Sequence, residues 1–515
     1  MLRSIMTVGG WTMASRILGF ARDMLIAAKL GAGPVADAFF LALRLPNLFR
    51  ALFGEGAFNA AFVPAFAGTL AAEGHARARA LANHMAGLMT IVLSLLVVAG
   101  MVFMPQVLRV IAPGFDDGDG IRFPLAVELT RITFPYLLLI CLAALVSGVL
   151  NGLNRFAAAA ATPMLFNLIS MASLLALTPY VATAGHALAW GVTASGVAQL
   201  GMLLYAARAH GMAVNPFSVP RLTAEVRQVL RRMVPGVIGA GVTQVNLAVN
   251  VAISSLLPAG AVSYLYYADR LVQLPLGVIG AAIGTALLPA LSQQIRLGRR
   301  LTAHRSQNRA IELSLAFALP SAVGLGVAAG PIVGALFQRG AFDSAAGAAT
   351  AAALLAYAAG LPAFMIVKAL TPGFFARGDT STPVKVGVFI IALNLSLNLA
   401  LMPVLGHVGI ALSTSVAAWV NTAVLAFILV RRRQLRPDRR LRRALPRLVF
   451  AALVMGAALA AMVAFAYPQA AAVITRIGAL LAMIVAAGVL YFGTAQLTGG
   501  LDLRAALRMM RRRRT

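Results

Sequence analysis

Long apolar segments, most of them roughly 20 or more residues, alternate with short polar connections along the whole chain. Because an α-helix rises about 1.5 Å per residue, about 20 residues cross the roughly 30 Å of bilayer hydrocarbon. The strict apolar–polar alternation of outer-membrane barrel strands is absent from the sequence. We therefore predict an all-α integral membrane protein with about 14 transmembrane helices. The expected helices are 5–29, 35–70 (broken), 81–104, 124–150, 157–178, 186–208, 228–257, 261–292, 310–336, 345–373, 383–403, 408–430, 446–467 and 472–497.

Composition supports a membrane protein. Of the 515 residues, 60% are hydrophobic and 11% are charged, whereas about a quarter of the residues of a soluble domain are charged. The first apolar segment carries Arg16, Arg22 and Asp23 where a signal peptide is apolar, so we expect a retained first helix. The single cysteine, Cys141, excludes a disulfide framework within one chain.

The net charge of +28 is distributed unevenly over the connections. Most of the basic residues outside the apolar segments follow even-numbered helices, within 208–232, 296–309 and 431–447, and in the C-terminal tail. Because basic connections stay in the cytoplasm, both termini are predicted to be cytoplasmic in a multi-pass protein of the bacterial inner membrane. We interpret this charge as a topology signal that also contacts anionic membrane lipids, and we expect no nucleic-acid partner.

The two halves of the sequence resemble each other at an offset of about 225 residues. Arg44 aligns with Arg270, Pro135 aligns with Pro362, and the segment 112–116 aligns with 339–343. Each copy holds six helices, so both copies enter the membrane in the same orientation, as in transporters built from parallel repeats. We predict an N-terminal six-helix lobe at 1–220, a second six-helix lobe at 221–433, and two extra helices with a basic tail at 434–515.

Ionisable residues within the predicted spans are costly, at about 2.5–3.5 kcal/mol each at a helix centre, so they are expected to line an interior. The first two helices hold four arginines against three carboxylates, and Arg270 occupies the corresponding place in the second lobe. Arginine keeps its charge when desolvated and offers a planar fork of donors to phosphate oxygens. We expect a phosphate-bearing ligand, although Asp23, Asp37 and Asp269 are also candidates for structural ion pairs. A structural role is favoured for Glu128, Arg131, Glu312 and Lys368.

Enzyme motifs are lacking. The histidines never occur in metal-ligand spacing, and no glycine-rich phosphate loop precedes Lys-Ser or Lys-Thr. We therefore predict a transporter without catalytic residues or a cofactor, driven by a coupling ion or the membrane potential; the sequence leaves the question of a bound metal open. The alternative from another class is a lipid-processing membrane enzyme, which is disfavoured because no paired catalytic carboxylates or histidines face a common connection.

Four segments strongly resemble the MurJ/MviN family of lipid II flippases. They are Ser-Arg-Ile-Leu-Gly-Phe-Ala-Arg-Asp at 15–23, Asp-Ala-Phe-Phe at 37–40, Leu-Pro-Asn-Leu-Phe-Arg at 45–50 and Tyr-Tyr-Ala-Asp-Arg-Leu at 266–271. The resemblance implies the fold of the multidrug/oligosaccharidyl-lipid/polysaccharide exporters. It also implies transfer of undecaprenyl-pyrophosphate-linked peptidoglycan precursor, lipid II, from the cytoplasmic to the periplasmic leaflet, with cell-wall synthesis proteins as possible partners.

The resemblance also assigns residues. Arg16, Arg22 and Arg270 match the arginines of the family's central cavity, and Gln273 departs from the glutamate found in some members. Two related functions stay open: export of another undecaprenyl-linked glycan, and cation-coupled multidrug export, although the latter favours a carboxylate-rich cavity. The residues expected around the cavity arginines are Ser15, Asp37, Asn47, Arg50, Glu55, Ser263 and Asp269.

Overall fold

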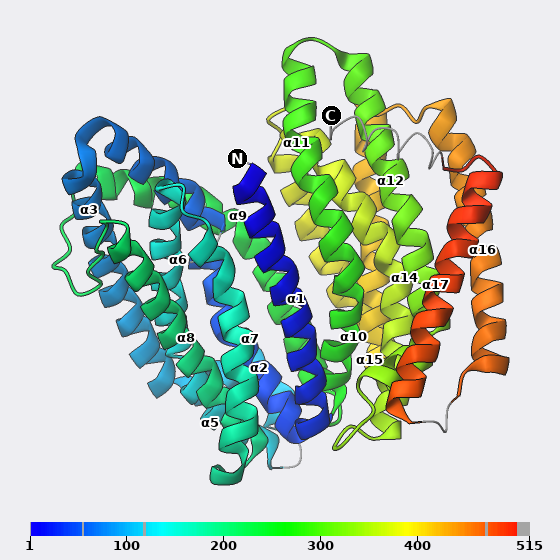
Figure 1. Cartoon of the computed structure of the whole chain (residues 1–515), viewed down its shortest axis with the longest axis horizontal. Helices are drawn as coiled ribbons and strands as arrows, with labels where there is room; N and C mark the ends of the chain where they lie inside the picture. The colour runs from blue at the N-terminus through cyan, green and yellow to red at the C-terminus, as the bar shows by residue number, and fades with distance from the viewer. Residues whose placement is uncertain (1, 54–55, 117–119, 469–471, 502–515) are drawn as a thin grey trace. The chain divides into compact units, whose positions relative to one another are not determined.

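The computed structural model describes residues 2–53, 56–116, 120–468 and 472–501, and all regular secondary structure in these ranges is helical (Figure 1). The elements up to residue 255 are α1 (Leu2–Leu30), α2 (Pro34–Phe53), α3 (Gly56–Val102), α4 (Met104–Ile111), η1 (Pro113–Phe115), α5 (Arg122–Thr133), α6 (Tyr136–Gly152), α7 (Ala157–Leu177), η2 (Thr178–Tyr180), α8 (Ala184–Ala209) and α9 (Ala224–Ser255). The later elements are α10 (Ala261–Pro275), the π-helical turn η3 (Leu276–Gly280), α11 (Ala281–Arg296), α12 (Arg300–Val327), α13 (Ala329–Leu336), α14 (Ser344–Phe375), α15 (Ser381–Arg431), α16 (Arg439–Ala466) and α17 (Val473–Leu497).

The chain forms two compact units. The first contains the described residues up to Ser263 together with Arg339–Phe342, and the second contains the other described residues from Tyr264 onward. The division by sequence repeat, at residues 220 and 433, stays a prediction, because the compactness of a unit and the internal repeat are different properties.

Several predicted helices are interrupted at residues that explain the break. Pro135 lies between α5 and α6, where the missing N–H and the ring of proline end a helix. Gly406 adopts a left-handed conformation (φ 55°) inside the 51-residue α15, which is long enough for two crossings of the bilayer. This kink separates the two helices predicted at 383–403 and 408–430. The predicted helix 261–292 is divided by the π-helical turn after Pro275.

Membrane-spanning character is clear from length and composition. Nine helical segments of the described ranges are long and apolar enough to cross a membrane, which confirms an all-α integral membrane fold. The predicted number of about 14 spans stays a prediction. The nine segments are Phe58–Val102, Arg122–Gly152, Ala157–Tyr180, Ala184–Ala209, Arg300–Val327, Ser344–Phe375, Ser381–Arg431, Arg439–Ala466 and Val473–Leu497.

The core of the first unit is built around three phenylalanines on one face of α3. The rings of Phe58 and Phe62 stack with centroids 5.1 Å apart, and Phe66 continues the row at 5.7 Å from Phe62. On the facing helix α6, a Cβ at Gly152 would lie 2.6 Å from the Phe66 ring, so the absence of a side chain there allows close packing. Within a bilayer the hydrophobic effect does not drive helices together, so transmembrane helices commonly carry small residues where they pack closely.

Two connections of the first unit make similar contacts. Gly114 in η1 packs against the end of α9, where an added Cβ would lie 2.4 Å from the Ser255 carbonyl oxygen. Gly340, in the segment contributed from the later sequence, packs against the end of α1, where an added Cβ would lie 2.2 Å from the Ala28 carbonyl oxygen. These glycines lie in the segments that the sequence repeat aligns, so each copy of the connection reaches the end of the other copy's first helix.

In the second unit, hydroxyl and indole groups of α15 bond to backbone carbonyls of α14. The Ser415 hydroxyl donates to the Ala356 carbonyl at 2.7 Å, and the Trp419 indole donates to the Ala359 carbonyl at 2.9 Å. A Cβ at Gly360 would lie 2.5 Å from the Ser415 hydroxyl oxygen, which explains the small residue at this crossing. Polar groups that bond across helices are a common means of fixing their register in a membrane.

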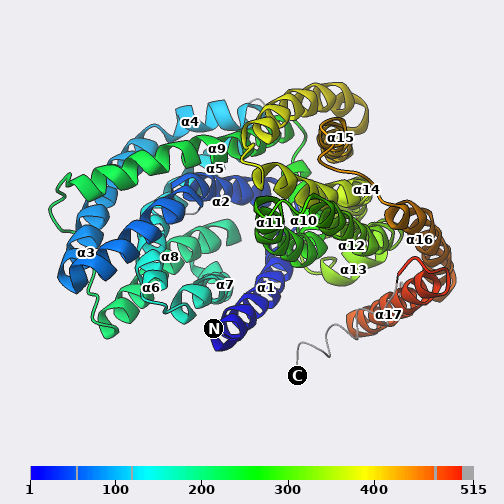
Figure 2. The same ribbon diagram turned by 90° about the horizontal axis from the view of Figure 1, so that it is seen from above.

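The last two helices, α16 and α17, run side by side along the second unit, next to α12 and α13 (Figures 1 and 2). Near the start of α16, the buried carboxylate of Glu312 on α12 forms ion pairs with Arg309 of the same helix and with Arg440 of α16. The Arg440 Nε and Nη2 each lie 3.2 Å from Glu312 Oε1. The Arg309 Nη2 also donates to Asp438 at 2.6 Å. The structural role favoured for Glu312 from the sequence is confirmed by these ion pairs.

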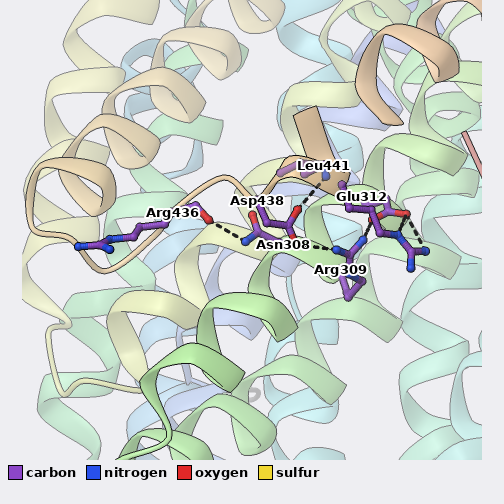
Figure 3. Close-up of polar contacts among 7 residues, drawn as sticks. Asn308, Arg309, Glu312, Arg436, Asp438 and Leu441 are labelled. Carbon is purple, nitrogen blue, oxygen red and sulfur yellow. Dashed lines mark hydrogen bonds and ion pairs between the residues drawn. The ribbon is translucent and has the colours of Figure 1, made fainter. Parts of the chain in front are cut away.

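Backbone groups complete this polar network (Figure 3). Asp438 caps α16, because its carboxylate accepts the Leu441 N–H at 2.7 Å, and the Asn308 amide donates to the Arg436 carbonyl at 2.8 Å. The connection between α15 and α16 is thereby attached to α12 through both charge and backbone hydrogen bonds.

Candidate functional site

Arg22 and Asp23 of α1 form a buried ion pair. The Arg22 Nε and Nη2 donate to Asp23 Oδ1 at 3.1 and 2.7 Å, and the two residues are 6% and 3% exposed. The Arg22 guanidinium also lies 5.2 Å from the centre of the Phe166 ring of α7, within cation–π range. Arg22 is therefore held in a fixed orientation by a carboxylate and by an aromatic face.

α1 is also anchored to α7 one to two turns before Arg22. The Asn167 side-chain amide donates to the backbone carbonyl of Ser15 at 3.0 Å, and a Cβ at Gly19 would lie 3.3 Å from the Asn167 amide nitrogen. Arg16 is half-buried in this stretch of α1. Phe166 and Asn167 thus position the helix that carries the two arginines, and no sequence motif had marked them.

Asp37 of α2 and Ser263 of α10 come together in the first unit, although they are far apart in sequence. Both are fully buried, and the Asp37 carboxylate accepts the backbone N–H groups of Gly260 at 2.7 Å and Ser263 at 2.8 Å, as well as the Ser263 hydroxyl. A carboxylate at the N-terminus of a helix satisfies N–H groups that have no partner within the helix and opposes the positive end of its dipole. Asp37 therefore serves as a cap for α10 that is supplied by another helix.

Arg122, at the start of α5, strengthens the same region. It is 5% exposed, its Nη1 donates to the Leu257 carbonyl at 3.0 Å, and its guanidinium lies 5.0 Å from the centre of the Phe115 ring. In the sequence this residue lies in the connection between the predicted helices 81–104 and 124–150, and no motif marks it. Only its partners, which come from η1 and the α9–α10 turn, distinguish it.

Asn47 and Arg50 follow the proline of α2. The Asn47 amide donates to the Leu43 carbonyl at 2.8 Å, and the Arg50 Nε donates to the Asn47 side-chain oxygen at 3.0 Å. Pro46 has no N–H for the carbonyl of Ala42, and the Thr133 hydroxyl donates to that carbonyl at 3.0 Å instead. The remaining first-lobe candidate, Glu55, lies outside the residues that the structure describes.

Arg270 and Asp269 lie on α10 in the second unit, and both are half-buried. The Arg270 Nε and Nη2 donate to the Tyr266 hydroxyl at 3.1 and 2.9 Å. Gln273, where some family members carry glutamate, donates its amide hydrogen to the Asp269 carboxylate. The substitution to glutamine therefore gives Asp269 a neutral donor in place of a second negative charge.

The candidate residues are held in pairs in the structure. Arg22 with Asp23, Asp37 with Ser263, Asn47 with Arg50 and Arg270 with Tyr266 form local pairs. Convergence of Arg16 and Arg22 with Arg270 on one ligand stays a prediction. Within the described ranges, no group of three or more histidine, cysteine, aspartate or glutamate side chains has the arrangement of a metal site.

Comparison with known proteins decides the family. The family model described as lipid II flippase MurJ matches residues 26–499. The chain belongs to the MurJ family. A relative from Rhizobium meliloti (strain 1021), a probable lipid II flippase MurJ, is 44% identical, and the alignment covers 99% of this chain and 96% of the relative. A lipid II flippase MurJ from Burkholderia cenocepacia is 36% identical over 97% of this chain and 98% of its own length.

Solved structures confirm the fold of this MurJ family member. A lipid II flippase MurJ in an inward closed conformation matches with a TM-score of 0.75 and 23% identity, covering 94% of this chain and 98% of that one. An inward-facing multidrug resistance MATE transporter of the MOP superfamily matches with a TM-score of 0.68 and 15% identity, covering 83% and 98%. The family resemblance and the exporter fold expected from the sequence are both confirmed.

Proposed function

We propose that this protein is a flippase that moves lipid II, the undecaprenyl-pyrophosphate-linked peptidoglycan precursor, from the cytoplasmic to the periplasmic leaflet by alternating access. The observation that carries the proposal is the match of the MurJ family model to residues 26–499, supported by 44% identity to a probable lipid II flippase over nearly the whole chain. The protein is accordingly a multi-pass protein of the inner membrane that acts in cell-wall biogenesis.

The candidate arginines suit the pyrophosphate of this substrate. Arg16 and Arg270 are half-buried, so their guanidinium groups combine partial desolvation with access to a ligand, and we assign them to direct contact with phosphate oxygens. Arg22 is more deeply buried against Asp23 and Phe166, and we assign it to the electrostatic field of the site and to the positioning of α1.

The other assignments extend this proposal. The protein carries out transport without catalytic residues, and the membrane potential or a coupling ion supplies the energy, at about 2.3 kcal/mol per charge per 100 mV. Both termini are cytoplasmic, which places the basic connections near anionic lipid headgroups. Proteins of cell-wall synthesis are the expected protein partners.

The test is complementation of a strain depleted of its own flippase, with lipid-linked precursors measured in each leaflet. We expect Arg16→Ala and Arg270→Ala to fail, because an unpaired phosphate in a partly dry site costs roughly 2–5 kcal/mol. Arg16→Lys and Arg270→Lys should complement poorly, since lysine keeps the charge but loses the bidentate geometry. Arg77→Ala is the matched control, because this arginine is exposed and pairs only loosely with Glu73 at 3.7 Å.

Two results would contradict the proposal. Full complementation by both alanine variants at normal membrane expression would remove the arginines from substrate binding. If depletion of this protein in its own host leaves lipid II transfer normal and another undecaprenyl-linked glycan accumulates instead, the related glycan exporter is favoured. Failure of the variants through loss of expression would assign the arginines to structure.

A further inference from the structure

A cleft of about 850 Å³ opens in the first unit between α4, α5, α8 and the connection that precedes α8. It contains none of the residues assigned above to lipid II. Its walls are mainly apolar and include Phe123, Ile132 and Trp190, while Glu128, Arg131 and His186 supply its ionisable groups. Ligand sites commonly combine an apolar wall with a few polar groups of this kind, within a similar range of volumes.

Glu128 and Arg131 present opposite charges to the cleft. They are three residues apart on α5, so they lie on one face of the helix with Cβ atoms about 5–6 Å from each other. The Arg131 Nε donates to the Met101 carbonyl at 2.9 Å, which restricts the orientation of the guanidinium. The Glu128 side chain is 63% exposed and therefore accessible to a ligand.

His186 of α8 adds a buried donor. The residue is 7% exposed, and its Nδ1 lies 2.8 Å from the Thr183 hydroxyl oxygen. If the hydroxyl donates to Nδ1, the proton of the neutral ring is on Nε2. This Nε2 lies 3.2 Å from a Glu128 carboxylate oxygen but lacks hydrogen-bond geometry to it, and in the described part of the chain it has no hydrogen-bond partner. A buried N–H that makes no hydrogen bond, at the wall of a cleft, favours a ligand that accepts one.

The charges of the cleft select among amphipathic ligands. A purely anionic headgroup is repelled by the Glu128 carboxylate, and a purely cationic headgroup is repelled by the Arg131 guanidinium. A headgroup with an ammonium and a phosphate satisfies both, and the phosphate also accepts the His186 N–H. The apolar wall, with an exposed tryptophan of the kind enriched at membrane interfaces, suits the glycerol and acyl portions of a lipid.

We propose that this cleft binds a phosphatidylethanolamine molecule, with its ammonium on Glu128 and its phosphodiester on Arg131 and His186. A primary ammonium donates hydrogen bonds to the carboxylate, whereas the quaternary ammonium of phosphatidylcholine has no N–H to donate. The connections that precede α5 and α8 are extracytoplasmic in the proposed topology, so the lipid belongs to the outer leaflet. Only this choice of leaflet rests on the proposed function.

The experiment is native mass spectrometry of the full chain, released from detergent and titrated separately with dioleoyl phosphatidylethanolamine, phosphatidylglycerol and phosphatidylcholine. We expect the first bound phosphatidylethanolamine to be favoured over the other two lipids by roughly 1.5- to fivefold, the range of one partly exposed charged contact. Glu128→Gln should remove the preference over phosphatidylglycerol, while Arg131→Gln should weaken the binding of both lipids. The matched controls are Glu73→Gln and Arg77→Gln, which alter an exposed pair of opposite charges outside the cleft.

Equal binding of all three lipids by the unaltered protein would overturn the proposal. So would a Glu128→Gln protein that keeps the full preference, or a control variant that loses it to the same extent. If Arg131→Gln lowers the unfolding temperature because the contact to Met101 is lost, Glu128→Gln decides the question, since the Glu128 side chain is largely exposed. Flipping is not measured in this experiment, so its failure leaves the proposed function unaffected.

Discussion

The close approach of Gly340 to the end of α1 predicts a large effect of adding a single methyl group. Gly340 has φ +58°, and an added Cβ would lie 2.2 Å from the Ala28 carbonyl oxygen, a backbone atom that no rotamer change can move. The next residue, Ala341, donates its N–H to the same oxygen at 2.9 Å. Relief of the clash therefore requires the segment to move away and to give up this hydrogen bond.

Three contributions add to the free energy of unfolding that Gly340→Ala should remove. A left-handed conformation costs a residue with a side chain about 1–2 kcal/mol. Forced overpacking costs about 1–3 kcal/mol, and the lost hydrogen bond costs about 1 kcal/mol. Gly298→Ala is the matched control, because Gly298 has φ +70° and nothing within 4 Å of its added Cβ. The control variant should lower the free energy of unfolding only by the cost of the left-handed conformation, about 1–2 kcal/mol.

The assay is thermal unfolding of the purified full chain, combined with hydrogen exchange at the Ala341 amide. We expect Gly340→Ala to unfold several degrees below both the unaltered protein and Gly298→Ala. If the segment detaches before the unit unfolds, the Ala341 amide loses its protection instead. Equal unfolding temperatures for the two variants, together with an Ala341 amide as protected as in the unaltered protein, would refute the contact.

Two further predictions concern topology and a surface ion pair. In a background without the native cysteine, Tyr180→Cys should react with an impermeant thiol reagent from the periplasm and Leu301→Cys only after permeabilisation; the reverse pattern would invert the topology. Hydrogen bonds from Thr382, and then from Arg432 at 2.6 Å, hold the pKa of Asp379 well below its usual value. Because a depressed pKa stabilises the folded state above the ordinary pKa near 4 and loses this effect only as pH falls through the folded value, Asp379→Asn should lower the unfolding temperature equally between pH 5 and 8. A difference that titrates within this range would contradict the assignment.

The sequence alone determined the class of the protein and its family. A run of about 20 apolar residues is a local property that reports the solvent around a helix, so the membrane character followed without any knowledge of contacts. The motifs at 15–23, 37–40 and 266–271 are short contiguous segments that are recognisable without any knowledge of contacts. They pointed to the MurJ family, which the comparison then confirmed. The break at Pro135 was predictable for the same reason, because the missing N–H acts within one helix turn.

The tertiary structure decided what individual charged residues do. Asp37 is a cavity candidate by sequence, yet its carboxylate caps α10 through the N–H of Ser263, 226 residues away. No sequence motif marked Arg122, and its buried position depends on contacts with Leu257 and Phe115. The helix pattern determines which groups must avoid lipid, because the free energy of exposing an ionisable side chain to lipid depends on that residue alone. It does not determine their partners, because these are brought together only when distant segments pack.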